Sequence, residues 1–185
     1  MKLGMVTYLW GAKWDLPTVI KNCETTGFAG VELRSTHKHG VEVTLAPAQR
    51  REVRKRFDDS TVTLVGLGTA CEYHSADHGV VQQNIELNRR FLELSHDVGG
   101  SGIKVRPNGF VKGEDRARTI ERIGKALRTC ATSAAEFKQQ IRLEVHGRGT
   151  KEPAVIRQIV DIAGESNGAT LLQTSSRVAR SSGIP

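Results

Sequence analysis

The sequence predicts an α/β protein of the TIM-barrel type, in which (β/α) repeats form an incomplete barrel of about five and a half units. Strand-like apolar runs alternate with amphipathic helical patterns about every 30 residues, as in βαβ units around a parallel sheet. The first strand–helix junction, LWGAKWD, carries neither glycine-rich phosphate motif of a nucleotide-binding open sheet. Polar residues recur at the carboxyl ends of several strands, where barrel enzymes build their sites. These observations favour a barrel, and a complete small open α/β domain is the structural alternative.

The first predicted unit occupies the N-terminus. Residues 3–10, LGMVTYLW, are apolar enough for a strand. Asp15 then has the side chain of a helix N-cap, and the predicted helix covers residues 16–26. Pro17 suits the first turn of that helix, and Gly27 suits its end.

The second and third strands flank a strongly basic helix. GVELR at 30–34 and TVTLVGLG at 61–68 are short, apolar and rich in β-branched residues. The helix predicted over residues 46–57 places Val53 and Phe57 four residues apart, on one side. That side is expected to face the sheet.

The later elements repeat the alternation. A long helix is predicted over residues 80–99, with Gly99 as its end and an apolar stripe of Val80, Leu87, Phe91, Leu94 and Val98. The remaining strands are predicted at 102–106, 141–145 and 168–173, and the remaining helices at 116–137 and 153–163. We expect residues 1–174 to form one domain and residues 175–185, which are small, basic and without pattern, to be a disordered or aberrant tail.

Composition limits the class of protein. The chain is 38% hydrophobic and 25% charged, as in globular proteins. No run approaches the roughly 20 apolar residues of a membrane span, and no signal peptide is evident. Cys23, Cys71 and Cys130 form no CxxC pair, which favours buried reduced thiols over disulfides. We therefore expect a cytoplasmic protein that has no membrane partner.

The net charge of +7 raises the possibility of nucleic-acid binding. Much of the excess lies in one run of the basic helix, at Arg50, Arg51, Arg54, Lys55 and Arg56. No further aromatic residues alternate with these charges, as a stacking surface for bases requires. A solvated helix face is the favoured interpretation and a phosphate-binding surface the alternative, so nucleic acid is not expected as a partner.

Four polar pairs follow or end the predicted strands, and in each pair the residues are two apart. The pairs are Glu32 and Arg34, Glu72 and His74, Lys104 and Arg106, and Glu144 and His146. Residues two apart in a strand project to the same side, so at a barrel mouth the pairs would converge. Carboxylates and imidazoles suit Mn²⁺, Mg²⁺, Zn²⁺ or Co²⁺, whereas lysine and arginine suit an anionic or polyhydroxy substrate. Metal-assisted proton transfer next to a carbonyl would use both groups.

Each pair also has a purely structural interpretation. Glu32 and Arg34 can be an ion pair at the barrel rim, and Lys104 and Arg106 a solvated strand end. Glu144 is the strongest functional candidate, because a carboxylate within an apolar strand is costly unless it is paired or bound to metal. His74 suits a packing role as well as a catalytic one. The other histidines are expected to be mostly solvated, and they are His37, His39, His78 and His96.

Four segments together resemble one family. They are GFAGVELRSTHKHGVE, LVGLGTACEYHS, GIKVRPNGF and IRLEVHGRGT, in this order and spacing. Over about residues 3–165 the chain is similar to the sugar phosphate isomerases and epimerases of the xylose isomerase-like TIM-barrel superfamily. The resemblance implies metal-dependent proton transfer on a ketose or related polyol. It implies a divalent metal at the barrel mouth, with a sugar or sugar phosphate as the small-molecule partner.

The resemblance also implies roles for individual residues. The family's strand-five glutamate, a metal ligand, matches Glu144, and His146 lies beside it as a second catalytic candidate. The candidates for substrate binding, from the strand ends and from the loop after the fifth strand, are Glu32, Arg34, Glu72, His74, Lys104, Arg106 and Arg148.

The chain departs from the family pattern after its fifth unit. The family's further ligands, an Asp or Asn from strand six, a His from strand seven and a Glu from strand eight, have no match here. We therefore expect a C-terminally truncated fragment that is inactive as a lone monomer, retains little or no metal and can form homo-oligomers through open barrel edges. The alternatives are the AP endonuclease branch of the superfamily, which acts in DNA repair, and a non-catalytic sugar-binding or interaction module.

Overall fold

The computed structural model describes residues 2–164 and the strand at 171–174. The predicted tail at 175–185 lies outside these residues, and the single domain over 1–174 stays a prediction. The strands are β1 Gly4–Val6, β2 Gly30–Arg34, β3 Thr63–Glu72, β4 Gly102–Arg106, β5 Gln140–Glu144 and β6 Leu171–Thr174. The helices are α1 Leu16–Thr26, α2 Pro47–Asp58, α3 His78–Asp97, α4 Arg116–Glu136 and α5 Pro153–Ala163.

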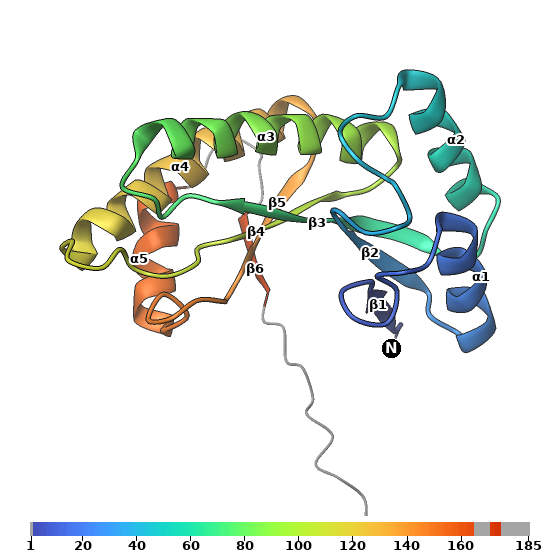
Figure 1. Ribbon diagram of the computed structural model, residues 1–185, viewed down its shortest axis with the longest axis horizontal. Helices are drawn as coiled ribbons and strands as arrows, with labels where there is room; N and C mark the ends of the chain where they lie inside the picture. Colours follow the sequence, from blue (N-terminus) through green and yellow to red (C-terminus); the bar gives the residue numbers. More distant parts are fainter. Residues whose placement is uncertain (1, 165–170, 175–185) are drawn as a thin grey trace, which may run out of the picture.

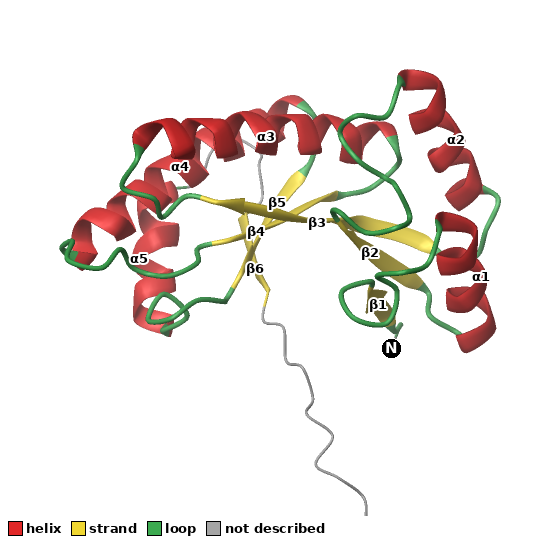
Figure 2. Ribbon diagram, viewed as in Figure 1, coloured by secondary structure: helices red, strands yellow, loops and turns green. Residues whose placement is uncertain are grey.

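The strand order shows which α/β architecture the chain adopts. The strands form one parallel sheet in the order β1-β2-β3-β4-β5-β6, so neighbours in sequence are neighbours in space. Helices α1–α5 form an arc along one face of the sheet, and the other face is turned away from them (Figures 1 and 2). A doubly wound sheet instead reverses its strand order and carries helices on both faces. The predicted incomplete barrel is confirmed.

The first unit is partly as predicted. Asp15 accepts a hydrogen bond from the Thr18 N–H at 2.9 Å, and Gly27 ends α1 with a left-handed φ of +77°. The predicted strand over residues 3–10 is too long, because β1 ends at Val6 and the chain then turns. The apolar side chains of Tyr8, Leu9 and Trp10 therefore lie exposed instead of within the sheet.

The long helix α3 begins earlier and faces the core differently from the prediction. Asp77 caps it by accepting a hydrogen bond from the Gly79 N–H at 2.7 Å. Val80, assigned to the apolar stripe, is 40% exposed, whereas its neighbour Val81 is buried. The end of the predicted stripe is correct, since Phe91, Leu94 and Val98 are buried.

The two faces of the sheet differ in polarity. Side chains that face the helices are apolar and buried, for example Val31 and Leu33 in β2 and Ile141 and Leu143 in β5. The alternating residues face the inside of the partial barrel and are mostly polar or glycine. This inner face carries the predicted site residues of the strands.

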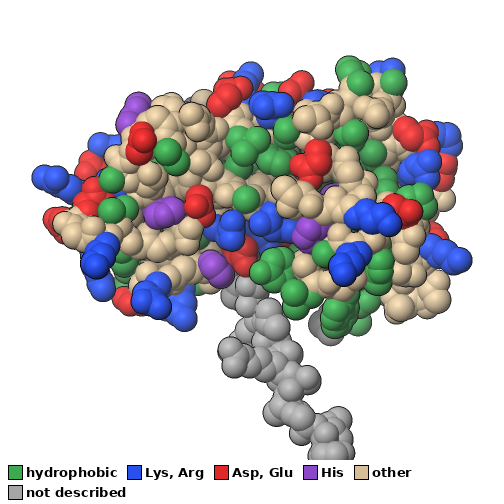
Figure 3. Space-filling model, in the orientation of Figure 1, with side chains coloured by type: hydrophobic (Ala, Val, Ile, Leu, Met, Phe, Trp, Pro, Cys, Tyr) green, Lys and Arg blue, Asp and Glu red, His purple; other side chains and the backbone are tan. Residues whose placement is uncertain are grey.

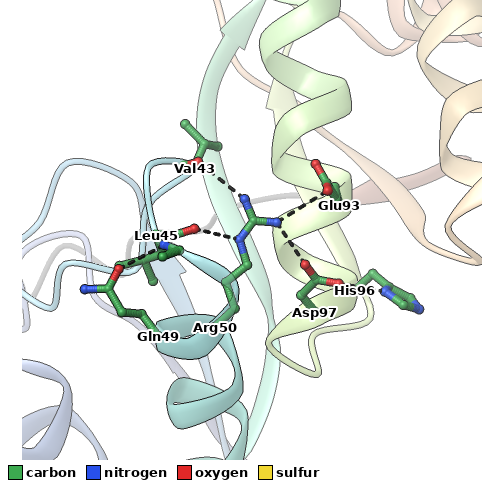
Figure 4. A network of polar contacts seen from close by, with 8 residues as sticks. Val43, Leu45, Gln49, Arg50, Glu93, His96 and Asp97 are labelled. Carbon is green, nitrogen blue, oxygen red and sulfur yellow. Dashed lines mark hydrogen bonds and ion pairs between the residues drawn. The ribbon is translucent and has the colours of Figure 1, made fainter.

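The basic helix α2 is more than a solvated face. The side chain of Arg50 is only 12% exposed, donates to Asp97 at 2.8 Å and to the Leu45 carbonyl oxygen at 3.0 Å, and so joins the loop before α2 to the end of α3 (Figure 4). The interpretation as a solvated face is wrong for Arg50. The next turns pair their charges on the helix surface, as Arg54–Asp58, Lys55–Asp59 and Arg56–Glu52. Most of the positive run is thus balanced locally.

The three cysteines are free and buried, as predicted. Cys130 lies against the buried Tyr73 hydroxyl at 3.5 Å, and Asn88 donates to the same hydroxyl at 2.7 Å. Burial raises the pKa of the Cys130 thiol to about 12. This cluster therefore ties the residue that follows β3 to α3 and α4 without offering a reactive thiolate.

Candidate functional site

Three of the predicted residues form one charged cluster on the inner face of the sheet. The Lys104 Nζ lies 2.7 Å from Glu32 Oε1 and 3.6 Å from Glu144 Oε2. The three side chains are 12–14% exposed and come from β2, β4 and β5. We call these residues the Lys104 cluster. In Figure 3, side chains of Lys or Arg, Asp or Glu, and His gather over the middle of the sheet, where β3, β4 and β5 lie in Figure 1.

A glycine of the intervening strand makes the cluster possible. Glu32 and Lys104 are on β2 and β4, and β3 lies between them. Gly68 of β3 pairs in register with both Arg34 and Lys104. A Cβ atom on Gly68 would lie 2.8 Å from Glu32 Oε1, so a side chain there would occupy the path of the carboxylate. The ion pair therefore crosses a strand at the point where that strand has no side chain.

Arg142, a buried arginine, lies on β5 two residues before Glu144 of the cluster. Sequence reasoning assigned it no role. Arg142 Nη1 donates to the Val65 carbonyl oxygen at 3.1 Å, and its Nη2 donates to Ser101 Oγ at 2.6 Å and to Gln140 Oε1 at 3.0 Å. Burial lowers the pKa of Arg142, and the charge of Glu32 opposes this shift. The available signal was its spacing of two from Glu144, which places both residues on the inner face.

Arg34 lies beside the cluster but makes a different set of contacts. Its Nη1 donates to Ser35 Oγ at 2.6 Å and to the Gly68 carbonyl oxygen at 3.2 Å. Burial and then the nearby charge of Arg106 lower the pKa of Arg34, while Glu144 and Glu32 act in the opposite direction. The predicted rim ion pair between Glu32 and Arg34 is therefore not the main contact of either residue.

Glu72 and Arg106 form a second group at the carboxyl ends of β3 and β4, and His74 follows β3 directly in sequence. Arg106 Nη2 lies 4.0 Å from Glu72 Oε2, and Asn108 donates a hydrogen bond to the same oxygen. The His74 carbonyl oxygen accepts a hydrogen bond from Arg122 Nη1 at 2.7 Å. Within the described residues, Arg106 Nε and His74 Nδ1 are buried polar atoms without a hydrogen-bond partner.

His146 and Arg148 lie apart from the strand residues. Strand β5 ends at Glu144, so the rule that residues two apart share a face does not extend to His146. Both side chains are exposed, in the loop between β5 and α5. Thr150 donates to the Asn108 carbonyl oxygen, which holds this loop against the loop that follows β4. Their assigned roles stay predictions.

Two histidines that were expected to be solvated flank Arg34. His39 is 7% exposed, its Nδ1 accepts a hydrogen bond from the Val41 N–H at 3.0 Å, and its Nε2 lies 2.8 Å from the Arg34 carbonyl oxygen. A neutral ring has one N–H, so Nε2 is the donor. His37 Nδ1 lies 3.2 Å from the Thr7 hydroxyl. The prediction of a solvated side chain is wrong for His39, because the loop after β2 folds back over the strand end.

We expect the protein to lose stability in mild acid partly through His39. Burial lowers the pKa of His39 in the folded state, so the unfolded chain takes up a proton first as the pH falls. The contribution of His39 to the free energy of unfolding is complete above its pKa in the unfolded chain, which is about 6.5. This contribution decreases as the pH falls through that value toward the lower pKa of His39 in the folded state. When the pH is lowered from 7.5 to 5.5, the free energy of unfolding measured in urea should fall less for His39→Asn than for the wild type. Equal losses in the two proteins would contradict this assignment.

The residues present do not complete a metal centre. The resemblance assigns Glu144 to a divalent cation, but its nearest charged neighbour among the described residues is the Lys104 ammonium. Within residues 2–164, no group of three or more His, Cys, Asp or Glu side chains is placed to hold a metal ion. Among the described residues, Glu144 is therefore a single candidate ligand and not part of a metal centre.

The sequential parallel sheet with its polar inner face defines a protein of the (β/α)-barrel class. The model of one family, described as the xylose isomerase-like TIM barrel, matches residues 20–174. This chain belongs to that family. No curated protein matches the sequence.

Solved structures confirm the fold. An IolI protein with a bound zinc atom superposes with a TM-score of 0.74 at 16% identity, over 89% of this chain and 60% of that one. A D-psicose 3-epimerase with D-fructose gives 0.72 at 17% identity, over 94% and 63%. The 3-keto-D-glucoside 4-epimerase YcjR from E. coli gives 0.74 at 14% identity, over 94% and 68%. The chain thus spans about 60% of the length of the first of these structures.

Within residues 2–164, no helix combines the length and the apolar character that crossing a bilayer requires.

Proposed function

We propose that the chain carries the substrate-binding part of a sugar or sugar phosphate isomerase or epimerase site, on the inner carboxyl ends of β2–β5. The observation that carries this proposal is the Lys104 cluster, which holds an ammonium between two carboxylates on three different strands. Membership of the xylose isomerase-like family supports it. Polyhydroxy substrates suit such a group, since carboxylates accept and an ammonium donates hydrogen bonds to hydroxyls.

The same groups suit proton transfer next to a carbonyl. Glu144 is the proposed base, which removes the proton from the carbon adjacent to the carbonyl. The electron pair moves to the carbonyl oxygen, and the Lys104 ammonium stabilises the resulting enediolate. Return of the proton from Glu144 to the former carbonyl carbon, with transfer of the hydroxyl proton from one oxygen to the other, completes an isomerisation. An epimerisation instead requires a second acid that protonates the opposite face of the same carbon.

We further propose that the isolated chain binds a ketose without turning it over. Glu32 and Glu144 are both engaged by Lys104, and His146 lies exposed beyond the strand end. A cation bound at Glu144 would need further ligands from residues beyond those described or from another chain. We therefore include a homo-oligomer in this proposal, since a second copy of the chain could supply such ligands. We expect the chain alone to bind metal weakly.

Thermal unfolding tests this function. In EDTA, ribulose should raise the melting temperature, because a ligand that binds only the folded state stabilises it. Glu144→Gln should remove most of this shift, whereas Glu121→Gln, at an exposed position on α4, should retain it. When Mn²⁺ replaces EDTA, the melting temperature should rise little further. The NMR spectrum of the sugar should show no conversion to an isomer or epimer. Absence of a ketose-dependent shift in the wild type would contradict the sugar site, and conversion would contradict the proposed inactivity alone.

A further inference from the structure

Asn108 joins the carboxyl ends of three neighbouring strands. It lies two residues after β4 and has a left-handed φ of +58°, a conformation that asparagine tolerates better than most residues. Its side chain contacts the end of β3, and its carbonyl oxygen contacts the loop that follows β5. The turn that contains Asn108 therefore holds groups from the strands on both sides of β4.

The side chain of Asn108 orients Glu72 at the end of β3. Asn108 Nδ2 donates a hydrogen bond to Glu72 Oε2, whereas Arg106 Nη2 lies 4.0 Å from the same oxygen. Within residues 2–164, the other oxygen of the carboxylate, Oε1, accepts no hydrogen bond. A carboxylate that is held by one oxygen presents the other in a fixed direction, as an acceptor for a hydroxyl group.

The carbonyl oxygen of Asn108 holds the loop between β5 and α5. It accepts a hydrogen bond from the hydroxyl of the buried Thr150, and Thr150 Oγ1 also lies 3.2 Å from the His146 carbonyl oxygen. Gly147 has a φ of +116° and lies against the same Asn108 oxygen, with which a Cβ atom would collide. These contacts fix the loop that carries the exposed side chains of His146 and Arg148.

A second contact keeps the same two loops together. Gly149 lies against the ring of Phe110, and a Cβ atom on Gly149 would be 2.9 Å from two ring carbons. The guanidinium of Arg116 lies over this ring, 4.9 Å from its centroid. The loops after β4 and β5 therefore form one wall of the barrel mouth, and Asn108 connects this wall to β3.

We propose that Asn108 is a positioning residue of the sugar site, which places Glu72 through its side chain and the loop of His146 through its carbonyl oxygen. This inference rests on the proposed function, because the ligand is the ketose of that site. One hydroxyl group of the ketose donates to Glu72 Oε1, and another part of the ketose meets the loop at His146. Groups that are already ordered bind a ligand more tightly, because ordering them costs no binding free energy.

Calorimetric titration of the full chain with ribulose in EDTA tests the proposal. Asn108→Gly keeps the left-handed backbone and the carbonyl oxygen but loses the amide, and it should weaken ribulose binding about fivefold. Thr150→Val removes the hydroxyl that donates to Asn108 and should have a similar effect, whereas Thr150→Ser should keep most of the affinity. Thr61→Val, at an exposed position just before β3, is the control and should bind ribulose as the wild type does.

NMR spectra of the ¹⁵N-labelled chain without a ligand separate positioning from a general effect on the fold. The side-chain amide resonances of Asn108 should move in Glu72→Gln, because their acceptor loses its charge. Residues 146–149 should gain mobility in Thr150→Val, seen as lower ¹H–¹⁵N NOE values, and should keep their wild-type values in Asn108→Gly, which retains the carbonyl oxygen.

The outcomes separate this inference from the proposed function. Wild-type affinity for ribulose in Asn108→Gly, or Asn108 amide resonances that do not respond to Glu72→Gln, would overturn the positioning role and leave the sugar site intact. Absence of ribulose binding by the wild type would contradict the proposed function and the sugar part of this inference, while the expected spectra would still support the contacts of Asn108. If Thr150→Val does not fold, Asn108→Gly and Glu72→Gln decide the question alone.

Discussion

Replacing Lys104 with methionine is expected to lower the free energy of unfolding by about 3 kcal/mol. The substitution keeps the length and the apolar stem of the side chain but leaves Glu32 and Glu144 without their shared cation. These carboxylates are only 12% and 14% exposed, so water replaces the lost partner poorly. Urea unfolding followed by circular dichroism measures the change.

Two further variants show whether the cluster itself is responsible. Lys125→Met removes a lysine that pairs with Glu121 on the exposed surface of α4, and it should cost no more than about 0.5 kcal/mol. Adding Glu32→Gln to Lys104→Met removes one of the two carboxylate charges that Lys104 neutralised, and it should restore part of the lost stability. A cost for Lys104→Met as small as that of Lys125→Met would mean that the cluster is hydrated.

Arg142→Met is expected to have an effect of similar size, about 3 kcal/mol. Arg142 gives hydrogen bonds to the Val65 carbonyl oxygen, to Ser101 and to Gln140, and the variant leaves these three acceptors without this donor. Urea unfolding should show the lower free energy of unfolding. Under native conditions, the three cysteines of the variant should stay unreactive toward a thiol reagent.

The matched control for this prediction is Arg90→Met on the exposed surface of α3, for which a change below about 0.5 kcal/mol is expected. Arg142→Lys keeps the charge but loses the fork, so it should lie between the wild type and Arg142→Met. Equal stability of Arg142→Met and the wild type would show that the buried charge costs as much as its hydrogen bonds contribute.

The fold follows from sequence pattern to a large extent, because alternation and caps are local properties. Asp15 and Gly27 mark the ends of α1 as their chemistry predicts. The limits of β1 do not follow in this way. Residues 7–10 are as apolar as a strand, yet β1 ends at Val6, and the Thr7 hydroxyl accepts a hydrogen bond from the Arg34 N–H at 2.9 Å. Such a contact between distant segments has no local signal.

The candidate site was partly predictable for the same reason. The spacing of two residues correctly placed Glu32, Lys104 and Glu144 on one face of the sheet. Which of these side chains touch depends on the register between neighbouring strands and on the space left by the missing side chain of Gly68. The sequence of one strand alone predicts neither. His39 was misjudged because a loop histidine reads as solvated until the fold of the loop is known.

The most direct test of the central claim is an NMR titration of the ¹⁵N-labelled chain with ribulose 5-phosphate. We expect saturable amide shifts that are largest at the inner carboxyl ends of the strands, at Gly68, Lys104 and Glu144, and small along the outer helices. Saturable shifts confined to the outer surfaces of α1–α5, or no saturable shifts at all, would contradict a sugar site on the inner face of this sheet.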